Sequence, residues 1–376
     1  YFVGYFIISH LLLPLYYRTN LLSIYTYLET RFGRIAQKTG AFFFLLSRTL
    51  GAAARLYLAA GVIQIFVFDR LEIKVPFALS VSIIIGLMLL YTYKGGIKTL
   101  VWTDTFQSLF LVLGVVLSIA AIISSTDWSV SETVSRLYNS DYSQVFFWDW
   151  HEKSFFGKQF LGGIFIAVAM TGLDQNMMQK NLSCRSLDDA QKNIFWFSVV
   201  MVVVNLFFLS LGALLYMYQQ EMNIPLPMSP DGKIISDQVF PNLALNHLGT
   251  FASLVFIIGL TAATFSSADS VLTTLTTSTY IDVFELDKRT GIGEKRKTAY
   301  RRMIHVSFAV LLLLCILMFK AFSQEEVITI ILITAGYTYG PLLGLFAFGI
   351  FNKREVPDKI IPIICLVAPG LTYALV

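Results

Sequence analysis

Charged residues are scarce in this chain: Asp, Glu, Lys and Arg make up only 14% of its 376 residues, while 56% are hydrophobic. Soluble globular proteins contain about 25% charged and about 45–50% apolar residues. The polar residues are therefore too few to cover a water-soluble particle of this size. This shortage excludes a soluble enzyme, a disordered chain and a nucleic-acid-binding domain as descriptions of the whole.

The usual motifs of catalysis and metal binding are also missing. The three cysteines, Cys184, Cys315 and Cys365, lie far apart and predict neither a disulfide framework nor a metal site. The four histidines show no ligand spacing, and there is no Gly-rich phosphate loop, catalytic triad or nucleophile elbow. We therefore expect no enzymatic activity.

Long hydrophobic runs dominate the sequence. A transmembrane helix needs about 20 apolar residues, and these runs are too long and too continuous for the alternating strands of a membrane barrel. Ten runs qualify, at 1–17, 40–68, 75–93, 99–124, 155–175, 192–218, 248–282, 303–322, 326–351 and 358–376. The chain does not begin with Met and has no signal peptide. We interpret residues 1–376 as one transmembrane domain of about ten helices, cut at both ends from a longer protein.

Lys and Arg divide the connections between these spans into two sets. One alternating set carries 19 of these residues and the other carries 7. Because cytoplasmic loops are enriched in Lys and Arg, the first set is predicted to be cytoplasmic, and the first helix then runs inward. The long external connection 126–154 is expected to hold a short interfacial helix, whereas 219–247, which contains three prolines and a glycine at 225–232, is expected to be a loop.

The densest polar signal inside a span is 261–280, where eleven of twenty residues are Ser or Thr. Helical spacing places Ser266 and Ser270 on one face, with Ser267 beside them and Asp269 three residues after Ser266. Hydroxyl and carboxylate oxygens are the ligands that hard cations prefer, and the carbonyl of Ala263 joins them if the helix is locally irregular. We therefore predict a cation site here, whereas the threonines after 272 are better explained by helix packing.

Four other ionisable residues lie within or next to spans, and three of them have two interpretations. Asp104 is either a cation ligand or a carboxylate stabilised by a helix dipole. Arg55 binds an anionic substrate or pairs with an intramembrane acid, whereas Arg48 lies nearer the cytoplasm and can snorkel. Asp174 marks either a break in a helix or an ordinary cytoplasmic helix end.

Five segments, in chain order, resemble motifs of the sodium:solute symporter family, which contains sodium-coupled sugar, sialic acid, proline, pantothenate and iodide carriers. The segments are Tyr27-Leu28-Glu29-Thr30-Arg31-Phe32-Gly33, the Gly-Gly…Thr-Asp…Gln pattern of 95–107, the Gly-Leu-Asp-Gln segment of 172–183, Ala262 to Ser270, and Gly340-Pro341-Leu342-Leu343-Gly344. A single match would be weak, but five in the family's order identify the chain as a member.

The resemblance implies an all-α, LeuT-type fold of two inverted five-helix repeats, with residue 1 inside the second core helix and the first core helix absent. It implies a main sodium site at Ala263, Ser266 and Ser267. It also implies a second sodium site at Asp104, Ser266, Asp269 and Ser270. Many relatives have Ser at position 269, and the Asp of this chain either strengthens the second site or turns it into a proton site. The candidate substrate-binding residues are Arg55, Gln175 and Tyr337.

The function implied is sodium-coupled import of a small organic solute by alternating access, with a carboxylate-bearing solute such as sialate or an amino acid favoured. The alternatives are a neutral sugar symporter and the transporter-like input domain of a membrane sensor. The expected partners are Na⁺, the solute and the lipid bilayer of the plasma (inner) membrane, in which the protein is a multi-pass monomer. No nucleic acid partner is expected.

Overall fold

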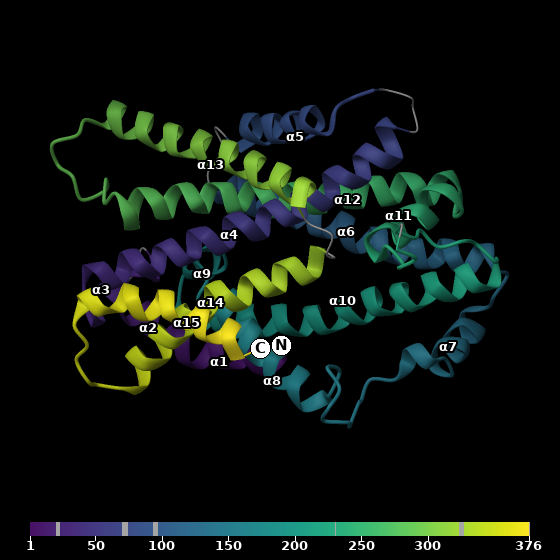
Figure 1. Cartoon of the computed structure of the whole chain (residues 1–376), viewed down its shortest axis with the longest axis horizontal. Coiled ribbons are helices and arrows are strands. Elements are labelled where there is room, and N and C mark those ends of the chain that lie inside the picture. Colours follow the sequence, from purple (N-terminus) through teal and green to yellow (C-terminus); the bar gives the residue numbers. More distant parts are fainter. Residues whose placement is uncertain (20–22, 70–73, 93–96, 230, 323–326, 376) are drawn as a thin grey trace.

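The computed structural model describes residues 1–19, 23–69, 74–92, 97–229, 231–322 and 327–375, apart from the side chains of 67, 91, 97–101, 103, 265–269 and 375. Every element named within this part of the chain is a helix. Figure 1 shows the long helices running along the longest axis of the molecule.

A helix occupies each of the ten predicted spans, and shorter helices lie between them. The first half of the chain forms α1 (Phe2–Ile7), η1 (Ile8–Leu12), α2 (Leu13–Thr19), α3 (Thr26–Arg31), α4 (Arg34–Ile63), η2 (Gln64–Phe68), α5 (Phe77–Thr92), α6 (Ile97–Ser125), α7 (Val130–Tyr138), η3 (Asp141–Ser143), α8 (Phe156–Ala167), η4 (Val168–Gly172) and α9 (Gln175–Leu182). The second half forms α10 (Leu187–Glu221), α11 (Ser236–Asn246), α12 (Gly249–Ser278), η5 (Thr279–Val283), α13 (Glu294–Phe322), α14 (Val327–Phe351), η6 (Asp358–Ile360) and α15 (Ile361–Leu375).

The helices differ in how completely each one could cross a membrane. Five described helices are long and apolar enough to do so alone, and α8–η4 with α9 makes a sixth that is bent by 66°. The apolar parts of α5 and α12 are shorter, at Phe77–Leu90 and Gly249–Thr264. The break in this bent span lies at Asp174, where the sequence predicted either a break or a helix end.

The connection 219–247, which is predicted to be external, is more ordered than expected. The prolines keep its first part irregular, but α11 (Ser236–Asn246) forms after them and contains Pro241. The expectation of a loop is therefore wrong for this half, because Val239, Leu243 and Ala244 bury their apolar side chains against neighbouring helices. The short helix expected in 126–154 is present as α7.

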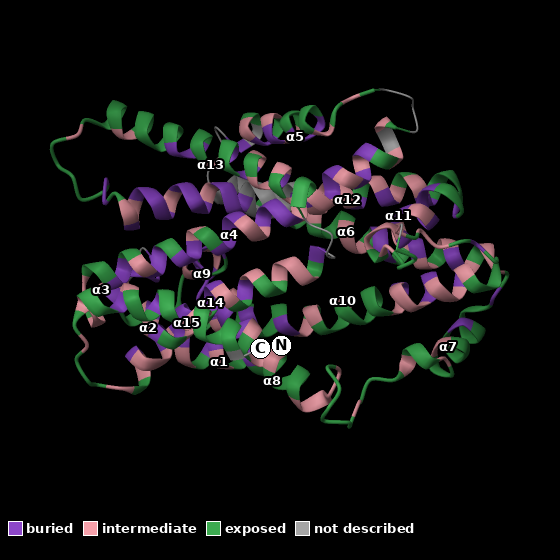
Figure 2. Cartoon of the chain, in the orientation of Figure 1, coloured by how far each residue is buried: buried purple, intermediate pink, exposed green. Residues whose placement is uncertain are grey.

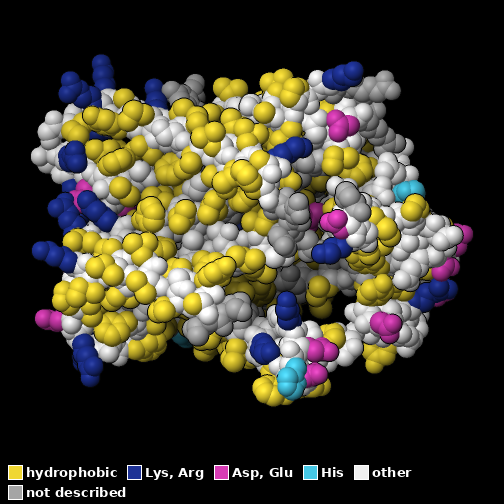
Figure 3. Space-filling view, in the orientation of Figure 1, with side chains coloured by type: hydrophobic (Ala, Val, Ile, Leu, Met, Phe, Trp, Pro, Cys, Tyr) yellow, Lys and Arg dark blue, Asp and Glu magenta, His cyan; other side chains and the backbone are white. Residues whose placement is uncertain are grey.

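Basic side chains gather at one end of the molecule. Figure 3 shows many Lys and Arg at the end where Figure 1 places α3 and the connection between α12 and α13, whereas α7 and α11 lie toward the opposite end. This arrangement agrees with the predicted division into a basic cytoplasmic end and an external end.

The start of α4 is capped from a distant part of the chain. Gly33, with φ of +129°, precedes the helix and supplies no capping side chain. Instead, the carboxylate of Asp358 accepts the backbone N–H groups of Ile35 at 2.9 Å and Ala36 at 2.7 Å. These N–H groups have no partner within the helix, so Asp358 ties α4 to the connection between α14 and α15.

One buried hydrophobic cluster packs the N-terminal helices against α4, α9, α10, α14 and α15, and a second lies where α4, α5, α12 and α13 meet. Alanines at 52 and 53 on α4 let the helices approach closely, and Leu272 and Leu275 of α12 pack against them. Figure 2 shows the half of α12 beyond its centre as largely buried. The polar residues on α4 and α12 are therefore held on a fixed framework.

Candidate solute and cation site

The break in the bent span is held by tyrosine hydroxyls. The π-helical η4 ends at Gly172, and α9 begins at Gln175. Tyr16 donates to the carbonyl of Gly172 and Tyr25 donates to that of Leu173, both at 2.9 Å. In a bilayer every backbone polar group needs a partner, so these hydroxyls stabilise carbonyls that the helix no longer satisfies.

Asp174 is the charged centre of this break. Its side chain is fully buried and caps α9 by accepting the N–H of Met177 at 3.0 Å. Arg48 of α4 forms an ion pair with the same carboxylate, and Tyr339 of α14 donates to it at 2.6 Å. The Arg48–Asp174–Tyr339 cluster therefore joins three helices at one buried point.

This cluster decides between interpretations that the sequence left open. Arg48 is only 5% exposed, so it does not snorkel; it neutralises Asp174 instead. Asp174 is not an ordinary cytoplasmic helix end, because its carboxylate holds a break inside the helix bundle. The sequence singled out both residues but not their pairing, and it gave no signal for Tyr339.

Arg55 lies two helical turns beyond Arg48 and has a different environment. It is half-buried and makes no ion pair with any residue that the structure describes. Together with Asp237, Ala263 and Thr264 it lines a cavity of about 270 Å³, whose remaining walls are Leu, Ile, Val and Ala side chains of α4, α12 and α14. The structure therefore favours a role for Arg55 toward something that enters this cavity.

A second cavity of about 220 Å³ adjoins the first. Both are lined by Leu58, Asp237 and Val327, and the second also contacts Gln64 and Lys320. Asp237 lies in the first turn of α11 and accepts the N–H of Val327, the first residue of α14, at 3.1 Å. The two cavities therefore form a path along the end of the bundle that carries α11.

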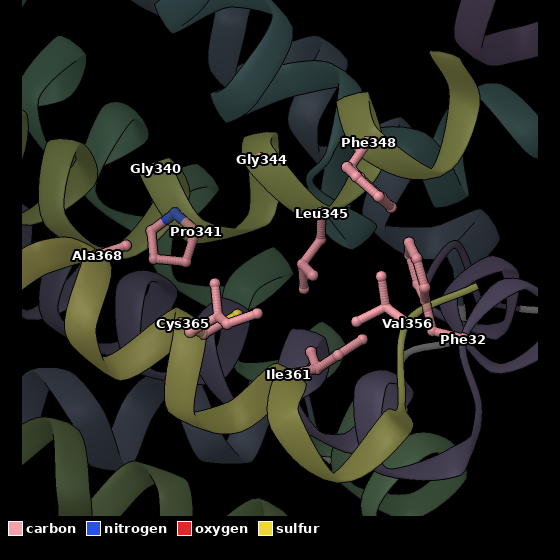
Figure 4. Close-up of a pocket in the computed structure, with 11 residues that line it drawn as sticks. Phe32, Gly340, Pro341, Gly344, Leu345, Phe348, Val356, Ile361, Cys365 and Ala368 are labelled. Carbon is pink, nitrogen blue, oxygen red and sulfur yellow. The ribbon is translucent and has the colours of Figure 1, made fainter. Parts of the chain in front are cut away.

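Two other hollows have the wrong chemistry for a polar solute. One, of about 280 Å³, lies between α14 and α15, where Pro341, Leu345 and Cys365 face it, as Figure 4 shows. Another, of about 530 Å³, is bordered by Leu12, Phe165 and Phe346. Among the residues that the structure describes, no charged side chain lines either of them, so a charged group placed there would lose its hydration without a partner.

The predicted main sodium site borders the cavity of Arg55. Ala263 lines that cavity, one turn before Ser266 and Ser267, whose side chains, like that of Asp269, lie outside the described part of the structure. The helix α12 is continuous from Gly249 to Ser278, so the irregularity considered for Ala263 is not seen. A carbonyl has two acceptor positions, and that of Ala263 can therefore serve a cation while remaining in the helix.

The described residues of the predicted second site contact α9. Asp104 is the eighth residue of α6, too far along the helix for the first-turn dipole, and it pairs with Lys180 at 2.6 Å. Ser270 donates to the Oδ1 atom of Asn176 at 2.8 Å. Asp104 and Ser270 thus both contact α9, Asp104 through Lys180 and Ser270 through Asn176.

Gln175 and Tyr337 are not brought to the cavity of Arg55. Gln175 is 1% exposed, and its side-chain oxygen accepts the N–H of Ile24 at 2.9 Å. Tyr337 is half-buried on α14, the helix that contributes Val327 to the cavity, but it does not line the cavity itself. Their assignment to substrate binding stays a prediction.

Sequence reasoning missed a second buried acid. Asp282 of η5 is fully buried and accepts hydrogen bonds from Ser278 at 2.7 Å, Ser23 at 3.0 Å and Gln37 at 3.3 Å. The available signal was an acid at the end of a Ser- and Thr-rich run. These contacts connect the end of α12 to α4 and to the segment before α3.

Comparisons with known proteins agree with this geometry. The model of the sodium:solute symporter family matches residues 1–356. Over its whole length the chain superposes, with a TM-score of 0.79 and 19% identity, on 83% of a substrate-bound, outward-open Na⁺-coupled sialic acid symporter. The predicted all-α, LeuT-type fold is thereby confirmed.

Curated relatives show the same family. A sodium/sialic acid symporter of Aliivibrio fischeri is 24% identical over 91% of this chain and 66% of its own length. A putative sodium-dependent multivitamin transporter of Drosophila melanogaster is 26% identical over 92% of this chain and 57% of its own length, and the mouse sodium-coupled monocarboxylate transporter 1 is 26% identical over 93% and 56%. The chain thus spans a little over half to two thirds of these proteins. With the family model matching nearly all of its residues, the chain belongs to the sodium:solute symporter family.

Proposed function

We propose that this chain forms the core of a sodium-driven symporter that imports a small carboxylate-bearing solute by alternating access. The observation that carries the proposal is that Arg55 and Ala263 line the same cavity, and that Arg55 has no ion-pair partner among the described residues. A half-buried guanidinium between apolar walls is costly unless an anion reaches it.

Arg55 suits a carboxylate better than a neutral solute. Its planar guanidinium group donates two parallel hydrogen bonds to a carboxylate, and such bidentate ion pairs are stronger than hydrogen bonds between neutral groups. A neutral sugar would bring no anion to Arg55, which makes no ion pair with Asp237, the acid that lines the same cavity. Relatives named for sialic acid and monocarboxylates, whose solutes carry a carboxylate, support the same choice.

Sodium binding would then be coupled to solute binding by charge. A Na⁺ ion at Ala263, Ser266 and Ser267 would border a cavity that already contains the positive charge of Arg55. A carboxylate placed in that cavity offsets both charges, so the bound solute raises the affinity for sodium, and sodium raises the affinity for the solute by the same factor. Inward movement of each positive charge gains about 2.3 kcal/mol per 100 mV of membrane potential.

The path of entry follows from the adjoining cavities. The outer one reaches Lys320 and Gln64, and the inner one reaches Arg55. An anion that enters through the outer cavity would meet the ammonium of Lys320 before the guanidinium of Arg55. These two positive charges outnumber the carboxylate of Asp237, which lines both cavities, and so favour the entry of an anion. We place this entrance on the external side of the plasma (inner) membrane, with the basic loops in the cytoplasm and the protein as a monomer.

Replacing Ser266 with alanine is expected to weaken sodium binding by about tenfold or more, because one of few oxygen ligands is lost. The measurement is the sodium concentration that gives half-maximal binding of ²²Na⁺ to the purified natural protein that contains this chain. Ser278→Ala is the matched control, since Ser278 lies on the same helix but donates to Asp282. An unchanged half-saturation in Ser266→Ala would remove this hydroxyl from the sodium site.

A further inference from the structure

One face of α9 meets the helices that carry the predicted second sodium site. Asn176 and Lys180 are four residues apart and therefore share that face. Lys180 contacts Asp104 of α6, and Asn176 accepts hydrogen bonds from Ser270 and Thr274 of α12 at 2.8 and 2.9 Å. The helix α9, which is the part of the bent span after its break, thus contacts both α6 and α12.

The contact between Lys180 and Asp104 is a close ion pair in a sheltered position. The Nζ atom lies 2.6 Å from Oδ2, and the two side chains are 35% and 16% exposed. The ammonium is a compact unit charge with three donors. It neutralises the one carboxylate among the described ligands of the second site.

A sodium ion at the same carboxylate would compete with this ammonium. Both are monovalent cations, and at a separation of a few ångströms beside this partly buried carboxylate they repel each other. Ser270 donates its hydrogen to the amide oxygen of Asn176, which fixes the orientation of this hydroxyl beside α9. In the described part of the structure, the ammonium of Lys180 therefore already occupies the position beside Asp104 that a sodium ion would need.

We propose that Lys180 is a built-in cation that takes the place of a second sodium ion at Asp104. The chain then binds a single sodium ion, at the site bordered by Ala263, and each transport cycle carries one sodium ion. This inference rests on the proposed function, because it assumes that the site at Ala263, Ser266 and Ser267 holds sodium.

The test is to count bound sodium ions on the purified natural protein in detergent, by saturation with ²²Na⁺. The wild type is expected to bind about one ion per chain with a Hill coefficient of about 1. Lys180→Met removes the ammonium and exposes the charge of Asp104, so about two ions and a Hill coefficient above 1 are expected. Lys180→Arg keeps the positive charge and should stay at about one ion, and Asp104→Asn combined with Lys180→Met should return to about one.

Lys192→Met is the matched control. Lys192 also pairs with an aspartate, Asp188, at 2.6 Å, but both side chains are exposed on α10. This variant should bind sodium as the wild type does.

Three results would overturn the inference. They are a wild type that binds two sodium ions, a folded Lys180→Met protein that still binds one, and a Lys180→Arg protein that binds two. If Lys180→Met does not fold, Lys180→Gln is used in its place. The number of sodium ions bound to the wild type tests the inference independently of either variant. A wild type that binds no sodium would contradict the proposed function itself, whereas one ion in both wild type and Lys180→Met would contradict this inference alone.

Discussion

Replacing Arg48 with methionine is expected to destabilise the protein by about 3–5 kcal/mol, because removing one partner of a buried ion pair leaves the other charge uncompensated. Asp174 is completely buried, and its remaining partners are the hydroxyl of Tyr339 and the N–H of Met177. Neither of these carries a charge that could replace the guanidinium. The loss should be visible in unfolding of the purified protein by SDS in mixed micelles.

The design separates loss of charge pairing from loss of packing. Combining Arg48→Met with Asp174→Asn removes both charges and should recover part of the stability, because residues in direct contact are not additive. Arg136→Met is the control: Arg136 pairs with Glu132 at 2.9 Å and with Glu221 at 3.6 Å, but all three side chains are exposed, and each such pair is worth less than about 1 kcal/mol. If Arg48→Met unfolds at the same SDS fraction as Arg136→Met, the cluster does not hold the break together.

Replacing Arg55 with lysine is expected to reduce sodium-driven uptake of a carboxylate solute by about tenfold to a hundredfold, with a smaller effect in the same assay on any neutral solute. A lysine keeps the charge but loses the planar bidentate geometry, so the solute is held less firmly and less well oriented. Arg55→Met should remove carboxylate uptake almost entirely. The measurement is initial uptake into proteoliposomes under an inward sodium gradient.

The corresponding control is Arg136→Lys, which changes an arginine on the external helix α7, outside the two cavities. It should leave uptake as in the wild type. Equal loss of carboxylate and neutral uptake in Arg55→Lys would argue for a structural role of Arg55, and undiminished carboxylate uptake would exclude it from substrate binding.

The sequence predicted the helical framework well, for physical reasons. A bilayer imposes a minimum length of apolar sequence on each span, and helices are found at all ten predicted runs. The expectation failed at α11, where apolar residues such as Val239 and Leu243 are buried by tertiary contacts despite nearby prolines. A local pattern does not contain the packing partner that stabilises such a helix.

Pairings between distant residues were beyond the sequence. Arg48 and Asp174 are 126 residues apart, and Asp104 and Lys180 are 76 apart. Arg48, Asp104 and Asp174 were identifiable by their cost inside a membrane, whereas Lys180 was not, and the cost does not name the partner. The sequence left two roles open for Arg55, a structural ion pair and substrate binding. Arg55 makes no ion pair with a described acid and lines the same cavity as Ala263, and both observations favour substrate binding.

The central claim is that sodium and a carboxylate solute are bound and moved together through the cavity of Arg55. The most direct test is to record transient currents from proteoliposomes of the natural protein. A panel of sugars, sialate, amino acids and small carboxylates is added with sodium and again without it. The account predicts a current that requires both sodium and a carboxylate-bearing solute. A sodium-dependent current with a neutral sugar but with no carboxylate would contradict the claim and favour a sugar symporter. The absence of any solute-dependent current in protein that binds sodium would contradict it and favour a sensor domain.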